Sequence, residues 1–170
     1  MADTIFLILL ILHIGFIVTW FGGAALFSMI IAPSLAKIAP ASRAEFVIAT
    51  LPRYMRFIAL SAIGSVLFGV LLFGYVTRSA ISLGPSSSGL PLIEAGAVLG
   101  LLAFILAMGV VYPAGNKLVK TMKQVSSSTA GASQSESVIS QLQKRMRIGA
   151  SSAAGILAIT LILMIVGASV

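Results

Sequence analysis

Four long apolar segments, separated by polar ones, dominate the pattern of the chain. They cover residues 5–31, 57–76, 92–112 and 148–168. At a rise of about 1.5 Å per helical residue, about 20 apolar residues cross the hydrocarbon core of a bilayer. The pattern therefore predicts an all-α integral membrane protein, a single four-helix bundle over residues 1–170. The first span closes at Pro33 and the third at Pro113, where we expect the helix to break or kink.

The two long polar segments, residues 34–56 and 114–147, carry weaker signals of their own. Ser42 and Glu45 have capping-box spacing, and Pro52 suits the first turn of a helix. We therefore expect a short surface helix over residues 42–50, separate from the second span. Residues 126–135 are rich in serine, glycine and alanine and are predicted to be flexible. The apolar residues that follow recur at helical spacing, which predicts an amphipathic helix leading into the fourth span.

The composition agrees with a membrane protein. Hydrophobic residues make up 59% of the chain and charged residues only 9%, which is too apolar for an ordinary soluble domain. The chain has no cysteine, so disulfides and thiolate metal sites are excluded. A net charge of +7 is typical of nucleic-acid binding, but basic residues kept on the cytoplasmic side of a membrane give the same excess. We therefore expect no nucleic-acid partner.

The positions of the basic residues predict the orientation of the chain. All of them except Arg78 fall in the two long polar segments. The positive-inside rule then places both segments in the cytoplasm and both termini outside. The predicted outer surface is small: residues 1–4, a turn over residues 84–89 and the last residues.

His13 is the only titratable side chain well inside a predicted span. It lies roughly 12 Å into the membrane, counted from the start of the first span. Counting along the other spans brings Gly69, Gly100 and Thr160 to a similar depth, and Trp20 lies two turns along the same helix face. Ionisable groups at this depth usually face the bundle interior.

Two interpretations of His13 are open. It could act as a metal or haem ligand or as a proton relay, or it could be a neutral packing residue bonded to Thr160 or to a backbone carbonyl. The chain has no second histidine, so it cannot supply both axial ligands of a bis-histidine haem. Glu94, Met164 and Asp3 are the candidate helpers, and a thioether beside an imidazole suits copper better than zinc.

Basic side chains also cluster where two spans begin. The expected role of this group is anchoring at the lipid headgroups, with Tyr54 in the aromatic belt, and headgroup or substrate binding is the alternative. Its members are Arg53, Arg56, Lys144, Arg145 and Arg147. No nucleophile–base pair, carboxylate pair or phosphate-binding loop is legible, so we do not expect the chain to be an enzyme by itself.

Three segments resemble a known family. LHIGFIVTWFGGAALF, with His13, Trp20, Gly22 and Gly23, is similar to the first helix of the copper-resistance protein D (CopD) type of membrane domain. RYMRFIALSAIGSVLFGVLL and QKRMRIGASSAAGILAITLIL resemble the basic starts of its second and last helices. The unit is more distantly similar to HemJ-type protoporphyrinogen oxidases, whose third helix carries a lysine that this chain lacks.

The resemblance implies copper handling at the plasma membrane, with His13 as the metal ligand. It also implies other membrane subunits as partners, and a copper-dependent oxidase or an ammonia- or methane-type monooxygenase would be a plausible host. Two alternatives stand beside this one: a purely structural accessory subunit, and a HemJ-like haem-binding oxidoreductase.

Overall fold

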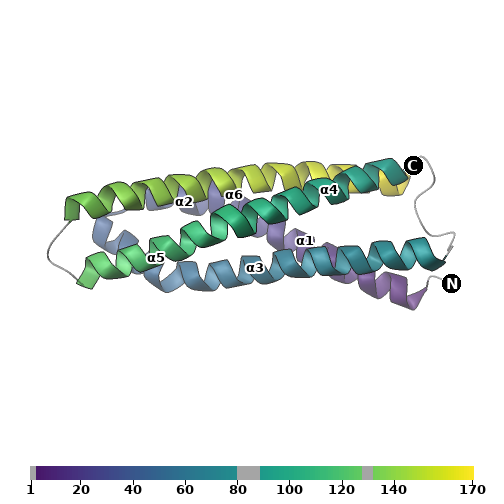
Figure 1. The fold of residues 1–170 in the computed structure, drawn as a ribbon, viewed down its shortest axis with the longest axis horizontal. Helices are drawn as coiled ribbons and strands as arrows, with labels where there is room; N and C mark the ends of the chain where they lie inside the picture. The colour runs from purple at the N-terminus through teal and green to yellow at the C-terminus, as the bar shows by residue number, and fades with distance from the viewer. Residues whose placement is uncertain (1–2, 80–88, 128–131) are drawn as a thin grey trace.

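A computed structural model of the protein describes residues 3–79, 89–127 and 132–170. Those residues form an elongated bundle of helices with no strand among them (Figure 1). Four helices are long and apolar enough to cross a membrane, spanning Thr4–Leu35, Pro40–Arg78, Leu90–Ser126 and Glu136–Ser169. The prediction of an all-α protein with four long apolar helices is confirmed for the described residues. The predicted outer turn lies outside the described residues, except for Gly89.

Proline shapes the first and third of these helices without ending them. The first consists of α1 (Thr4–Leu26), a π-helical turn (Phe27–Ile31) and α2 (Ala32–Leu35). The third consists of α4 (Leu90–Leu106), a π-helical turn (Ala107–Val111) and α5 (Tyr112–Ser127). Pro33 and Pro113 each follow a π turn at the same distance. A proline lacks an N–H, and its ring crowds the carbonyl group four residues before it. In both helices that carbonyl group lies in the π-helical turn, which is wider than an α-helical turn.

The second and fourth helices are continuous and longer than predicted. α3 (Pro40–Ser79) and α6 (Ala132–Ser169) contain 40 and 38 residues. The prediction of a separate surface helix over residues 42–50 is wrong, because α3 runs through it and holds Pro52 in its interior. The amphipathic helix before the fourth span is confirmed as the first part of α6. Of the segment predicted to be flexible, the described residues on either side of 128–131 are helical.

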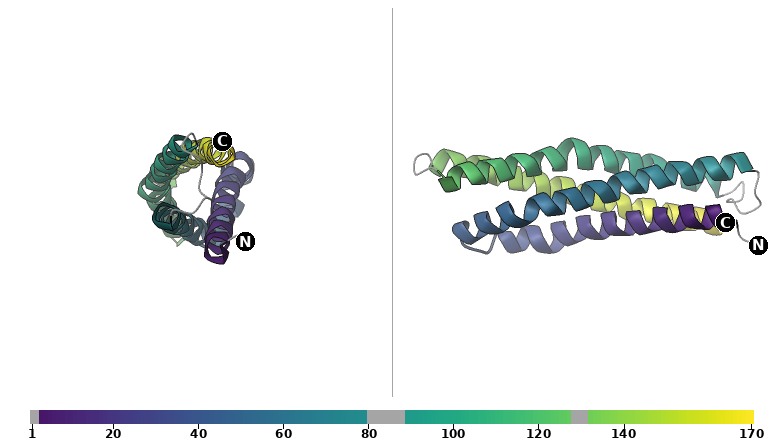
Figure 2. Two further views of the ribbon diagram at one scale, coloured as in Figure 1. Left: turned by 90° about the vertical axis from the view of Figure 1, so that its right-hand side faces the viewer. Right: turned by 90° about the horizontal axis from the view of Figure 1, so that it is seen from below.

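α3 and α6 carry an internal repeat. Residues 41–64 align with residues 132–155 without a gap. The two helices run in the same direction through the bundle, as Figure 1 and the right-hand view of Figure 2 show. The positions with the same residue in both are Ala41/Ala132, Ser42/Ser133, Glu45/Glu136, Val47/Val138, Ile48/Ile139, Leu51/Leu142, Met55/Met146, Arg56/Arg147, Ala59/Ala150, Ser61/Ser152, Ala62/Ala153 and Gly64/Gly155. The fold is thus two helical hairpins placed side by side in parallel, an arrangement known in membrane proteins.

Two clusters of buried side chains hold the hairpins together. One surrounds Trp20, which is 1% exposed and packs with Ile58, Ala62 and Leu157 at mid-bundle. The other lies toward the end that carries the basic segments, and there Met55 and Met146 of the repeat converge on Gly115. α3 is about 60 Å long at 1.5 Å per residue, twice the hydrocarbon thickness of about 30 Å. The bundle is therefore long enough to extend beyond the apolar part of a bilayer.

Candidate functional site

The imidazole of His13 is fixed between α1 and α3. Its Nδ1 lies 2.9 Å from the backbone carbonyl oxygen of Ser65. A carbonyl oxygen only accepts, so Nδ1 is the protonated nitrogen and donates to it. The neutral ring then keeps its lone pair on Nε2. A donor bond from one ring nitrogen to a carbonyl is how proteins orient a histidine that binds a metal through the other.

Gly69 provides the space that the ring occupies. A methyl carbon built on Gly69 would lie 2.8 Å from Cε1 and 3.0 Å from Nδ1 of His13, closer than ordinary carbon contacts of about 3.5–4.0 Å. One turn away, Phe16 occupies the corresponding space over Gly64 and stacks on Phe68 with ring centroids 5.5 Å apart. The glycines of α3 thus set the approach of α1, as small residues do between membrane helices.

The other residues predicted near His13 are engaged elsewhere. Gly100 of α4 faces the methyl group of Thr160 on α6, at 3.7 Å from a built Cβ. Thr160 is fully buried, and its hydroxyl has no hydrogen-bond partner among the described residues. Trp20 sits edge-on to Phe104, with ring centroids 6.4 Å apart. The structure therefore joins His13 with Gly69 on one interface and Gly100 with Thr160 on another.

The candidate helper ligands do not gather around the imidazole. Asp3 caps α1 by accepting from the Ile5 N–H at 3.0 Å and also accepts from the Tyr75 hydroxyl. The Tyr75 hydroxyl holds the pKa of Asp3 below its ordinary value, and the Ile5 N–H acts in the same direction. Glu94 is exposed, and Met164 packs against Gly96. Within the described ranges no three histidine, aspartate or glutamate side chains lie close enough to hold a metal.

The basic residues lie at the surface of the bundle, and their role as headgroup anchors stays a prediction. Arg53, Arg56, Lys144, Arg145 and Arg147 are all exposed. Arg53 donates from Nη1 to the Ala49 carbonyl at 3.2 Å, within its own helix.

Tyr54 is different, and its prediction as a belt residue is corrected. Its hydroxyl donates to the Gly23 carbonyl at 3.0 Å, and its ring stacks on Phe27 with centroids 5.1 Å apart. The reason is local: a methyl group at Gly23 would overlap the Ile58 side chain, so α1 and α3 come close enough there for the phenol to turn inward.

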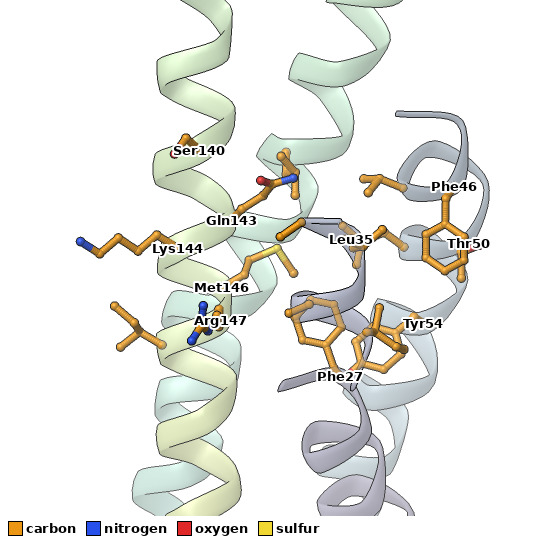
Figure 3. A pocket seen from close by; sticks show the side chains of 17 residues that line it. Phe27, Leu35, Phe46, Thr50, Tyr54, Ser140, Gln143, Lys144, Met146 and Arg147 are labelled. Atoms are coloured by element: carbon orange, nitrogen blue, oxygen red, sulfur yellow. The ribbon is translucent and has the colours of Figure 1, made fainter. Parts of the chain in front are cut away.

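A cavity lies beside Tyr54 and Phe27, and the sequence did not predict it. It has a volume of about 490 Å³ and lies between the end of the first helix, α3 and α6. Tyr54 and Phe27 line it, as do Lys144 and Arg147 (Figure 3). The repeat between α3 and α6 is the sequence signal that could have drawn attention to these two helices.

No protein-family model, curated protein or solved structure matches the chain.

Proposed function

We propose that the protein is a non-catalytic membrane subunit that handles copper or supports a copper-containing membrane oxidoreductase, and that His13 contributes a copper ligand. In this proposal the four helices cross the plasma membrane with both termini outside. The exposed apolar flanks of the helices then face lipid and neighbouring subunits. Exposed side chains such as Ile11, Val70, Ile105 and Ile165 provide such flanks on each of the four helices.

The observation that carries the proposal is the fixed orientation of His13. Its protonated Nδ1 is committed to the Ser65 carbonyl, and its Nε2 is left as a single imidazole donor at intramembrane depth. Cu(I) and Cu(II) both accept imidazole ligands. The described residues hold no group of three histidine, aspartate or glutamate side chains that could bind a metal ion. In this proposal the other copper ligands therefore come from another subunit.

The test is the copper content of the protein purified with its partners in mild detergent. We expect copper in the wild-type complex and its loss from His13→Ala, while Gly74→Ala, which alters α3 where nothing lies within 4 Å, retains it. X-ray absorption should show imidazole nitrogen in the wild-type copper shell. Unchanged copper and intact assembly in His13→Ala would refute the proposal.

A specific observation also favours the structural alternative. The Gly69 notch and the Ser65 carbonyl account for the placement of the ring without any ligand. If His13 only packs, His13→Ala lowers the stability of the subunit and leaves the metal content of the complex unchanged. A Soret band in the purified protein would instead favour the HemJ-like, haem-binding alternative.

A further inference from the structure

The cavity at the basic end of the bundle lies between α3, α6 and the end of the first helix. The two repeat helices contribute to it unequally. Val47 of α3 lines the cavity, whereas its repeat partner on α6, Val138, does not line it and is 37% exposed. At the end of the first helix, Ala32 and Ala36 contribute only methyl groups to the cavity wall, which leaves space beside Ile31 and Leu35.

The open side has an apolar interior. Phe27, Ile31, Leu35 and Val47 line it, and Met146 projects into it from α6 (Figure 3). Its volume of about 490 Å³ falls within the range of roughly 300–1,000 Å³ seen for small-molecule sites. The Tyr54 hydroxyl does not offer its proton to a ligand in the cavity, because it already donates to the Gly23 carbonyl.

The polar side chains that border the cavity are cationic or neutral. Arg147 and Lys144 contribute to its α6 wall one turn apart, with Gln143 and Ser140 beside them, and none of the described lining residues is acidic. Arg147 directly precedes the apolar run that begins at Ile148, which is where a membrane helix meets the headgroups. An apolar cavity interior next to exposed cationic side chains at the headgroup level is complementary to an anionic lipid, which has apolar acyl chains and a negatively charged headgroup.

We propose that this cavity binds one anionic phospholipid, with an acyl chain among Phe27, Ile31 and Leu35 and the phosphate at Arg147 and Lys144. The proposal is independent of copper and of His13, because His13 lies in α1 and the first helix lines the cavity only from Phe27 onward. The bound lipid fills the space that Ala32 and Ala36 leave between the end of the first helix, α3 and α6.

The repeat supplies a matched control for the test. The variant Lys144→Gln/Arg147→Gln removes the two charges at the cavity. The control Arg53→Gln/Arg56→Gln removes the two charges at the equivalent positions of α3, which do not line it. A third variant, Ala32→Leu, narrows the apolar part and keeps every charge. Native mass spectrometry of the full chain in detergent measures binding of phosphatidylglycerol and of phosphatidylcholine with the same acyl chains.

The wild type should bind one phosphatidylglycerol more tightly than phosphatidylcholine, by about fivefold per contacting charge. Lys144→Gln/Arg147→Gln should abolish the preference, the control pair should retain most of it, and Ala32→Leu should weaken both lipids. The proposal is overturned by equal affinity for the two lipids, or by a control pair that loses as much preference as the cavity pair. It is also overturned if Ala32→Leu binds both lipids like the wild type, or if cross-linking from residue 32 captures a second copy or a partner helix in the cavity.

Discussion

Replacing Gly69 by alanine tests the arrangement around His13 most directly. The added methyl would lie 2.8 Å from Cε1 and 3.0 Å from Nδ1 of the imidazole. To restore an ordinary carbon contact the ring must move by about 0.7 Å or more. Such a shift lengthens the 2.9 Å bond to the Ser65 carbonyl toward the limit of about 3.5 Å beyond which it no longer counts as one.

Three effects set the size of the change in unfolding free energy. Overpacking costs about 1–3 kcal/mol, and the lost hydrogen bond about 0.5–1.5 kcal/mol. Alanine is favoured over glycine within a helix by about 0.5–1 kcal/mol. We therefore expect Gly69→Ala to destabilise the bundle by about 0.5–4 kcal/mol, with about 2 kcal/mol as the central value. Gly74→Ala on the same helix meets nothing within 4 Å and should be neutral or stabilising.

Unfolding in mixed micelles can be followed through Trp20, the only tryptophan, which is 1% exposed in the folded state. In a double-mutant cycle, the cost of Gly69→Ala should vanish in the His13→Ala background, since the methyl then fills space that the ring has left. The reasoning fails if Gly69→Ala is as stable as Gly74→Ala, or if its cost is the same with and without the imidazole.

The same unfolding assay checks two further substitutions, and titration by NMR checks a third. Tyr54→Phe should cost about 0.5–1.5 kcal/mol through loss of the bond to the Gly23 carbonyl, and an unchanged stability would contradict that bond. Thr160→Val should stabilise the bundle by about 1 kcal/mol, because it removes a fully buried hydroxyl that has no partner among the described residues and keeps the methyl group that faces Gly100. Thr19→Val, at an exposed site, is the control. If Thr160→Val destabilises the bundle instead, the Thr160 hydroxyl has a hydrogen-bond partner in the folded protein. The pKa of Asp3 lies below its ordinary value of 3.8, chiefly because the Tyr75 hydroxyl donates to it. Its contribution to stability is therefore complete above pH 3.8 and is lost as the pH falls through the lower folded-state pKa. Tyr75→Phe should raise the pKa of Asp3 toward 3.8, and an unmoved carboxyl titration would rule the contact out.

The sequence by itself determined the four helices, because runs of apolar residues long enough to cross a bilayer have few other stable structures. It also determined that His13 lies well inside the first helix, about nine residues from its start, because that position follows from a count of residues along one helix. It did not determine how the prolines behave. Pro52 remains inside α3, where its neighbours Leu51 and Met55 are buried by other helices, and local rules carry no knowledge of that packing.

Only the tertiary structure decided which residues meet. A count along the spans puts Gly69, Gly100 and Thr160 at about the same depth as His13. Which of them contact each other depends on the rotation of each helix about its axis. That rotation places Gly69 against His13 and Gly100 against Thr160. The same rotation turned Tyr54 inward to Gly23. The repeat between α3 and α6 is legible in the sequence, yet the cavity beside α6 is not. It exists because Ala32 and Ala36 leave space where the end of the first helix meets α3 and α6.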